Sequence, residues 1–230
     1  MKKIGLVGGI GPASTIEYYR ELELLYQNTP QINRYPEIVI DSVDMAKHDK
    51  AIANKDYDLL AHYVLESLEN LKSAGANILA ITANTEHIVW DKICNKLPLP
   101  TVNLLEVVAQ EIERRQYNRI LILGTEWTMA SKLFETKILQ MGGNPITPCS
   151  EKQKEIGKLI YPNLEKGIVI LGDKKRLIRI IAEYYDKFNI DAVLLGCTEL
   201  PLMISDSDVN VPTINTTELH IREIFKQSLL

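Results

Sequence analysis

The stretch Ala192-Val193-Leu194-Leu195-Gly196-Cys197-Thr198-Glu199 decides the fold, because an earlier stretch of the chain repeats its pattern. Four apolar residues are enough for a buried strand, and small polar residues follow where the strand turns. The earlier stretch has the same order, with apolar residues at 78–81 followed by Thr82-Ala83-Asn84-Thr85-Glu86. This match predicts two related halves. A thiol stands at the strand end of one half, and a methyl group stands at the matching place in the other.

Two further matches extend the repeat. Residues 4–9 are matched by residues 120–125, and residues 99–103 are matched by residues 211–215. The three offsets are nearly equal, at 116 (4 to 120), 114 (83 to 197) and 112 (99 to 211). Such a near-constant offset indicates a duplicated structural unit. We predict an N-terminal half at 1–115 and a C-terminal half at 116–215, with a final helix at 216–230 that is assigned to the first half.

Strand-like runs alternate with helix-like runs throughout the chain. This alternation predicts an α/β fold in which each half is a parallel four-stranded sheet flanked by helices. Ligands bind beyond the carboxyl ends of such strands, so we expect the active site in the cleft between the two halves. The expected strands are 4–9, 38–43, 78–81, 101–102, 119–124, 144–147, 191–196 and 211–215. The expected helices include 105–115, about 129–141, a helical region at 151–188 and 218–229, whereas 47–58 is a polar stretch that precedes another helix.

Composition narrows the classes of function. The chain has 230 residues, 46% of them apolar, and a net charge of −4 with acidic and basic residues mixed along it. No basic patch suggests nucleic acid, and no apolar run approaches the roughly 20 residues of a membrane span, so we expect a cytoplasmic protein. The three cysteines are not spaced for metal binding, so we expect free thiols and no metal site.

Three motifs together resemble the aspartate/glutamate racemase superfamily, in its aspartate racemase branch. They are Gly8-Gly9-Ile10-Gly11-Pro12, Asn84-Thr85-x-His87 and Gly196-Cys197-Thr198-Glu199. The resemblance covers both halves in order. It implies a homodimeric amino-acid racemase that uses no cofactor and acts on a small acidic amino acid. It also implies one cysteine from each half on opposite faces of the substrate α-carbon, and here Cys197 fits the second cysteine while Ala83 replaces the first.

The chemistry of racemisation explains why Cys197 is the candidate acid/base. One group must remove a very weakly acidic α-proton, and another must return a proton to the opposite face. A thiol at a strand end, close to backbone N–H groups, is expected to have its pKa lowered from about 8.5 towards neutrality. The alternative interpretation is a cysteine packed in the core.

Small hydrogen-bonding residues at the strand ends are the candidate substrate ligands. They can hold the α-carboxylate and stabilise enolate charge, although turn formation and helix capping are the alternative roles. The glycine turn can bind a carboxylate through backbone amides at a helix start, which adds Ile10 and Gly11. The side-chain candidates are Asn84, Thr85, Thr125, Thr128 and Thr198.

A cation is expected for the side-chain carboxylate of the substrate. The resemblance places His48 where some aspartate racemases carry an arginine. The family's second cation is a lysine, whose position falls on Glu165 here, and Lys166 is adjacent. Surface solvation is the alternative role for the lysine. His87 and Glu199 follow their motifs at comparable positions, and either could orient a catalytic group.

Ala83 keeps two other functions open. One is a single-cysteine lyase, decarboxylase or proton-exchange enzyme, which needs to protonate a carbanion from one face only. The other is a non-catalytic protein that binds a small dicarboxylate.

Overall fold

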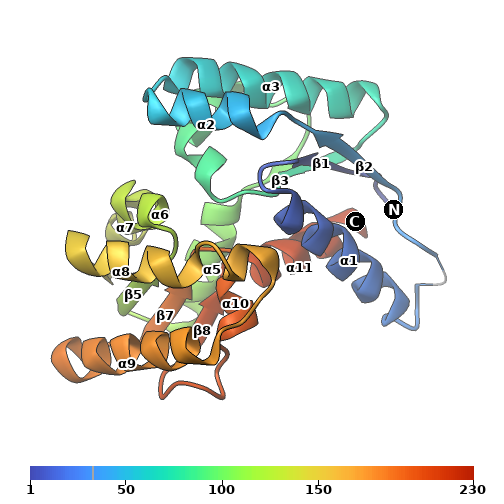
Figure 1. The fold of residues 1–230 in the computed structure, drawn as a ribbon. Helices are drawn as coiled ribbons and strands as arrows, with labels where there is room; N and C mark the ends of the chain where they lie inside the picture. The colour runs from blue at the N-terminus through green and yellow to red at the C-terminus, as the bar shows by residue number, and fades with distance from the viewer. Residues whose placement is uncertain (33) are drawn as a thin grey trace. The chain divides into compact units, whose positions relative to one another are not determined.

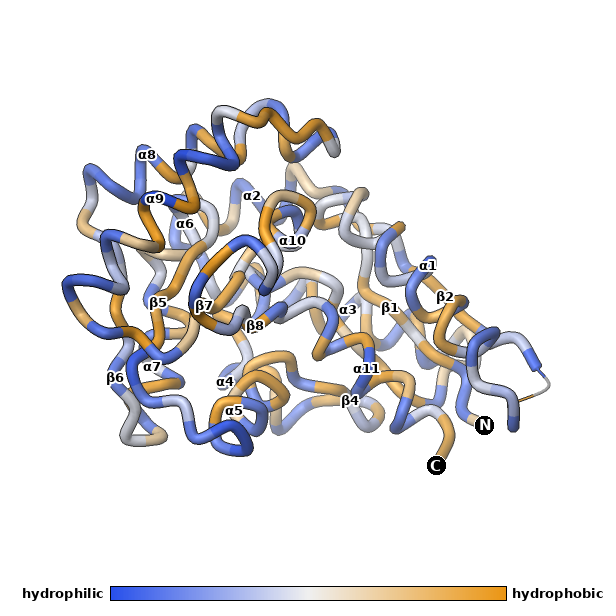
Figure 2. Tube along the Cα trace, turned by 90° about the horizontal axis from the view of Figure 1, so that it is seen from below, coloured by the Kyte–Doolittle hydropathy of each residue, from blue (hydrophilic) through white to orange (hydrophobic). Residues whose placement is uncertain are grey.

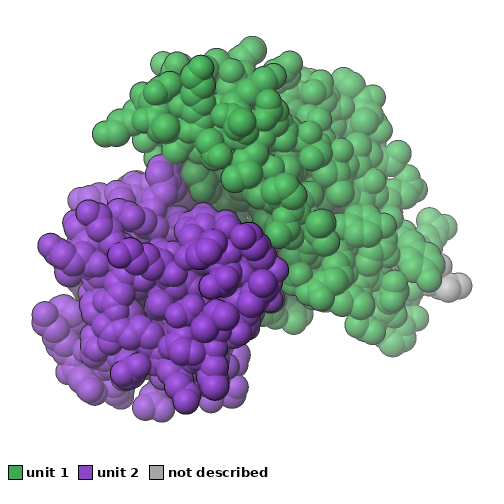
Figure 3. All heavy atoms as spheres, viewed as in Figure 1, with its two compact units in different colours: residues 1–104, 218–230 green, residues 105–217 purple. Residues whose placement is uncertain are grey.

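The computed structural model describes residues 1–32 and 34–230, which form two compact units. Unit 1 contains residues 1–104 and 218–230, and unit 2 contains residues 105–217 (Figure 3). The C-terminal helix therefore belongs to unit 1. The helix at 104–115, which the sequence grouped with the first half, lies almost entirely in unit 2.

Unit 1 is built on a parallel sheet of four strands in the order β2-β1-β3-β4. Figure 1 labels the first three of these strands. The central strands β1 and β3 are buried along their whole length, because apolar residues fill them and helices cover both faces. Val7 on β1 lies opposite Ile81 on β3, so the two strands end at the same edge of the sheet. The strands are β1 (Ile4–Gly8), β2 (Ile38–Ser42), β3 (Ile78–Ile81) and β4 (Thr101–Val102).

Helices cover both faces of this sheet. In Figure 1, α2 and α3 lie on one face, and α1 and α11 lie on the other. The helix α2 occupies the polar stretch for which no helix was predicted. It forms because Asp44 caps it by accepting the Ala46 N–H at 3.0 Å and because one narrow face is buried. The helices are α1 (Pro12–Gln27), α2 (Met45–Ala53), α3 (Tyr57–Ser73), η1 (Thr85–Val89), α4 (Trp90–Ile93), η2 (Cys94–Lys96) and α11 (Thr216–Ser228).

Unit 2 repeats the same sheet topology, with four parallel strands in the order β6-β5-β7-β8. Figure 2 shows the hydrophobic residues of β5 and β7 in orange. These strands pack with helices α8 and α9 into one core that includes Leu123, Leu195, Ile156, Leu177 and Ile180. The strands are β5 (Arg119–Leu123), β6 (Asn144–Ile146), β7 (Ala192–Leu195) and β8 (Thr213–Asn215).

The helices of unit 2 follow the predicted order with one break. The sequence predicted one helix at about 129–141, whereas two helices meet at Lys132, whose φ of +60° is incompatible with a continuous right-handed helix. The helices are α5 (Leu104–Arg115), α6 (Glu126–Ala130), α7 (Leu133–Gln140), α8 (Ser150–Ile160), η3 (Leu164–Lys166), α9 (Leu171–Phe188) and α10 (Leu200–Met203).

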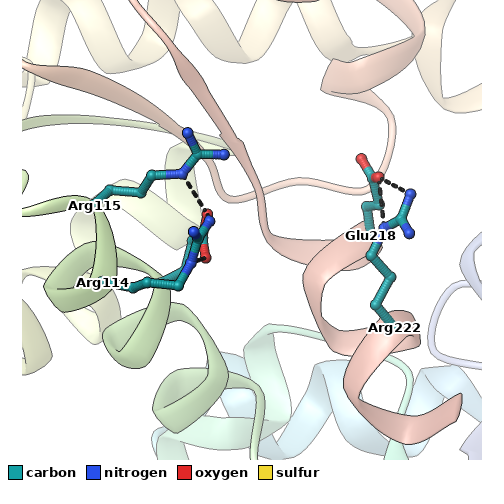
Figure 4. A network of polar contacts seen from close by, with 5 residues as sticks. Arg114, Arg115, Glu218 and Arg222 are labelled. Atoms are coloured by element: carbon teal, nitrogen blue, oxygen red, sulfur yellow. Dashed lines mark hydrogen bonds and ion pairs between the residues drawn. The ribbon is translucent and has the colours of Figure 1, made fainter. Parts of the chain in front are cut away.

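Ion pairs form between residues of the same helix in each unit (Figure 4). On α11, Arg222 contacts Glu218 at 2.8 Å, and on α5, Arg114 and Arg115 both contact Glu111. Exposed pairs of this kind contribute at most about 1 kcal/mol each. No helix in the described part of the chain has both the length and the apolar character needed to cross a membrane.

Candidate active site

Ala83 and Cys197 occupy equivalent places in their units. Ala83 lies two residues after the end of β3 at Ile81, and Cys197 lies two residues after the end of β7 at Leu195. In unit 1, β3 pairs with β1, which precedes the glycine turn. In unit 2, β7 pairs with β5, which precedes the turn at Thr125. Except for His48 on α2 and Lys166 on η3, the predicted site residues therefore lie in the segments that follow the two central strands of each sheet, where ligands bind in parallel-sheet proteins.

Cys197 is buried, and its thiol has a carboxylate partner. Its side chain is 7% exposed, and Sγ donates a hydrogen bond to Glu199 Oε2 at 2.7 Å. Burial raises the pKa of the Cys197 thiol well above its usual value, and the nearby Glu199 carboxylate raises it further. The expectation of a lowered pKa is therefore wrong for the free protein. The backbone N–H groups of the turn act in the expected direction, but burial and the carboxylate outweigh them.

The predicted threonines of unit 2 lie around the same strand ends. Thr125 caps α6 by accepting the Thr128 N–H at 3.1 Å, and the two hydroxyl oxygens are 2.9 Å apart. Thr128 also packs against Gly196, since a Cβ at Gly196 would lie 3.2 Å from the Thr128 methyl group. Thr198, directly after Cys197, is half-buried. Helix capping is thus an observed role of Thr125, and binding of substrate by these threonines stays a prediction.

The glycine turn of unit 1 is held by side chains from α1. Gly9 has a φ of +85°, which favours glycine, and its N–H donates to Thr15 Oγ1 at 2.9 Å. Ser14 donates to the carbonyl of Thr82 at 2.6 Å. The Thr82 side chain is fully buried and donates to the Val7 carbonyl at 2.9 Å. These bonds join the ends of β1 and β3, which places the turn containing Ile10 and Gly11 beside the turn containing Ala83.

His87 anchors the polar turn that follows β3. Its Nε2 accepts the Leu104 N–H at 3.3 Å, so Nδ1 carries the ring proton and donates it to the Ala83 carbonyl at 2.9 Å. Burial lowers the pKa of His87 to about 4, which keeps the ring neutral at physiological pH. Asn84 is buried and Thr85 is half-buried within this turn. The His87 ring thus positions the turn by hydrogen bonds to backbone groups of Ala83 and Leu104.

The two candidate cations differ in their surroundings. His48, on α2, is only 2% exposed, and its Nδ1 lies 3.6 Å from the Glu86 carboxylate. Lys166 is exposed and ends η3. Contact of either residue with a substrate carboxylate stays a prediction. Among residues 1–32 and 34–230, no group of three or more His, Cys, Asp or Glu side chains is arranged to hold a metal ion.

Sequence reasoning missed a buried polar network in unit 1. The Tyr18 hydroxyl lies 2.8 Å from His220 Nδ1, and His220 Nε2 lies 3.0 Å from the Val102 carbonyl. A carbonyl can only accept, so Nε2–H donates to Val102 and Nδ1 accepts from Tyr18. His220 comes from α11, so it ties the C-terminal helix to the end of β4. Spacing on α11 is the only signal in the sequence, because Thr217, His220, Ile221 and Ile224 all lie on its buried face.

Glu86 was also missed as a site residue. It is fully buried directly after Thr85, and it contacts His48. The sequence held one signal for this contact. His48, Ala51 and Ile52 follow the spacing of a buried helical face, which would have placed His48 inside the protein rather than in a polar loop.

Comparisons with known proteins identify similar sequences and similar folds. A family model described as Asp/Glu/Hydantoin racemase matches residues 7–224. The broad specificity amino-acid racemase RacX of Bacillus subtilis is 24% identical over 223 residues, which cover 93% of this chain and 92% of that protein. The crystal structure of an aspartate racemase homologue from Pyrococcus horikoshii is 30% identical with a TM-score of 0.89, and all of both chains is covered. The aspartate racemase of Picrophilus torridus shares the fold, with a TM-score of 0.74 at 23% identity over 98% of this chain and 94% of that one.

Proposed function

Because the chain belongs to the Asp/Glu/hydantoin racemase family, we propose that it racemises aspartate, glutamate or both, with Cys197 as an acid and base. The observation that carries the mechanism is the buried Cys197 thiol at the end of β7, hydrogen-bonded to Glu199 at 2.7 Å. A buried thiol with a proton acceptor at hydrogen-bond distance can both give and take a proton. Strongly perturbed titratable groups of this kind cluster at functional sites.

Cys197 and Glu199 handle the proton on one face of the substrate α-carbon. Water, Thr85 or another side chain gives or takes the proton on the opposite face, where Ala83 replaces the first cysteine. As an acid, Cys197 transfers its S–H proton to the substrate α-carbon and becomes a thiolate. As a base, Cys197 first passes its proton to Glu199, and the thiolate then removes the α-proton. The electron pair of the broken C–H bond stays on the substrate as an enolate. The burial that raises the thiol pKa makes the thiolate a stronger base, which suits a substrate proton of very low acidity.

The finer parts of the proposal follow from the residue types. Asn84, Thr85 and Thr198 would hold the α-carboxylate, with Thr125 and Thr128 supporting the turn in unit 2. His48 and Lys166 are the candidate cations for the side-chain carboxylate. We also propose that the enzyme needs no cofactor, forms a homodimer and works in the cytoplasm.

Ala83 favours a second candidate function. Its side chain is 9% exposed and carries no proton donor or acceptor, so it cannot replace a thiol. With Cys197 acting alone, the enzyme would exchange or add a proton on one face only, as in a decarboxylase or a proton-exchange enzyme. A protein that only binds a dicarboxylate is the remaining alternative.

The experiment incubates the protein in D₂O with each enantiomer of aspartate and glutamate. NMR follows loss of the α-proton signal, and chiral chromatography follows the configuration. C197A tests the thiol, and C149A is the matched control because it removes an exposed cysteine of the same unit. We expect wild type and C149A to exchange the α-proton and invert the configuration, and C197A to do neither.

The other outcomes separate the candidates. Exchange with retained configuration would replace racemisation by one-sided chemistry. An unchanged rate in C197A would refute the thiol mechanism. If neither exchange nor inversion occurs, release of CO₂ from substituted malonates would support a decarboxylase, and ligand binding without turnover would support a binding protein.

A further inference from the structure

A buried acid in the segment that follows β3 of unit 1 contacts a buried imidazole. Glu86, in η1, is fully buried, and His48, in α2, is 2% exposed. The distance from His48 Nδ1 to Glu86 Oε1 is 3.6 Å, which is within ion-pair range but too long for a good hydrogen bond. The His48 ring also packs against Tyr63 of α3, with 5.6 Å between the ring centroids.

The pair is costly to keep in this position. Neither carboxylate oxygen of Glu86 has a hydrogen-bond partner within the described residues, and the same holds for His48 Nδ1. Desolvation raises the pKa of Glu86, His48 lowers it, and Asp49 on α2 raises it slightly. With one shared proton the pair is neutral, whether as imidazolium and carboxylate or as imidazole and carboxylic acid. Apolar side chains of similar size would avoid this cost, so stability does not explain the pair.

The position of Glu86 in the chain suggests its role. Glu86 follows Asn84 and Thr85 immediately, and His87 follows Glu86. His87 fixes the turn to the Ala83 carbonyl and the Leu104 N–H, as described above. Glu86 adds a contact in another direction, to α2. The two consecutive side chains therefore connect the Asn84–Thr85 turn to two different parts of unit 1.

We propose that Glu86 and His48 are a positioning pair, which holds the Asn84–Thr85 turn in the geometry that binds the substrate carboxylate. The role of that turn rests on the proposed function. This role acts through the backbone of the turn and requires no contact with substrate. It is separate from the substrate contact proposed above for His48, and the exchange of the turn amides tests it alone. Ala83 makes this rigidity more important, because a turn without an acid/base of its own contributes through accurate binding alone. A misplacement of about 1 Å in such a site can cost about 100-fold in rate.

The test uses three variants of the full chain and one control. E86Q and H48Q each remove one ionisable partner and keep the approximate shape. H48L/E86M replaces the pair by apolar side chains and leaves no buried charge, so it should fold even where a single variant does not. The control is D58N, which removes an exposed ion pair of the same unit, Lys92 to Asp58 at 2.7 Å. Urea unfolding establishes that each variant is folded before any other measurement.

Two readouts are taken on the folded variants. Hydrogen exchange measures the protection of the backbone amides at residues 84–87, with or without activity. Kinetics with aspartate and glutamate measure KM, kcat and their dependence on pH. We expect H48L/E86M to be at least as stable as wild type, to exchange these amides at least about tenfold faster, and to raise KM about tenfold with a smaller change in kcat. The pH dependence of KM should lose one ionisation, and D58N should match wild type in every readout.

Wild-type exchange at residues 84–87 in H48L/E86M would overturn the proposal, as would a wild-type KM with an unchanged pH profile. If the double variant is unfolded, the same comparison is made with E86Q and H48Q, and wild-type protection in both overturns it. If wild type does not react with any acidic amino acid, the proposed function fails. The exchange data still decide whether the pair positions the turn.

Discussion

Lowering the pH should destabilise the protein through His220, and the size of the effect follows from its surroundings. His220 is fully buried, and burial is the main reason that its pKa falls to about 3, with a smaller contribution from His87. A histidine in the unfolded chain has a pKa of about 6.5. Below pH 6.5 the unfolded chain therefore binds a proton that the folded chain does not bind. The stabilisation is complete above about pH 6.5 and is lost as the pH falls towards 3.

The magnitude between pH 7 and pH 5 can be worked out from these two pKa values. The unfolded histidine gains most of a proton over this interval and the folded one gains almost none, so His220 alone costs about 2 kcal/mol of unfolding free energy. His87, whose pKa is about 4, costs a similar amount. The raised pKa of Glu86 acts in the opposite direction, because the folded state then takes up a proton first. A total for wild type would mix these effects, so the prediction is made for a variant.

The assay is urea unfolding of wild type and H220Q at pH 7 and pH 5. H220Q keeps a donor for the Val102 carbonyl, and its amide oxygen replaces the ring nitrogen as acceptor with a different geometry, so we expect the hydrogen bond from Tyr18 to weaken. We expect it to be about 1–3 kcal/mol less stable at pH 7. Between pH 7 and pH 5 it should lose about 2 kcal/mol less than wild type, because it has no buried imidazole to protonate. H62Q removes an exposed imidazole from α3 and should follow the wild-type curve. Equal losses in H220Q and wild type would refute the reasoning.

Three further predictions concern the strand ends and the surface. G196A should lower the unfolding free energy by about 1–3 kcal/mol, because the new Cβ would meet Phe134 at 3.0 Å and the Leu123 carbonyl at 3.1 Å; G172A, which meets nothing within 4 Å, is the control and should not be destabilised. E199Q should lower the Cys197 pKa, because the carboxylate raises it, and thiol alkylation at increasing pH measures this; an unchanged profile would contradict the contact. R222Q should change urea stability by less than about 1 kcal/mol, and a larger loss would mean that the exposed pair with Glu218 matters more than such pairs usually do.

The central strands could be predicted because their sequences permit little else. Short apolar runs such as 78–81 and 192–195, each followed by small polar residues, are typical of strands buried on both faces. The internal repeat predicted that the second half has the same fold as the first. The two sheets do have equivalent strand orders. The fold class is therefore confirmed, and so is the relationship to the racemases.

The surroundings of individual side chains could not be predicted. The helix α2 was missed because a polar run at 47–50 fills its middle, and only His48, Ala51 and Ile52 are buried. The pKa of Cys197 was predicted in the wrong direction, because the sequence indicates nearby backbone amides but not the depth of burial or the direction of the Glu199 carboxylate. Each of these errors concerns burial or a tertiary contact, which the spacing of residues along the chain does not encode.

The C-terminal helix affects the order in which the two units can fold during synthesis. Unit 1 includes α11, which is held by two hydrogen bonds at Ser228. The Lys2 N–H donates to the Ser228 carbonyl at 2.7 Å, and the hydroxyl oxygens of Tyr26 and Ser228 are 2.6 Å apart. On the ribosome, α11 emerges only after all of unit 2 has been synthesised. Until then, residues 1–104 lack one of the two helices on one face of their sheet, whereas unit 2 is complete once residue 217 has been synthesised. We expect the later unit to fold first, and the buried surfaces of Tyr18 and Tyr26 to need protection from aggregation during translation.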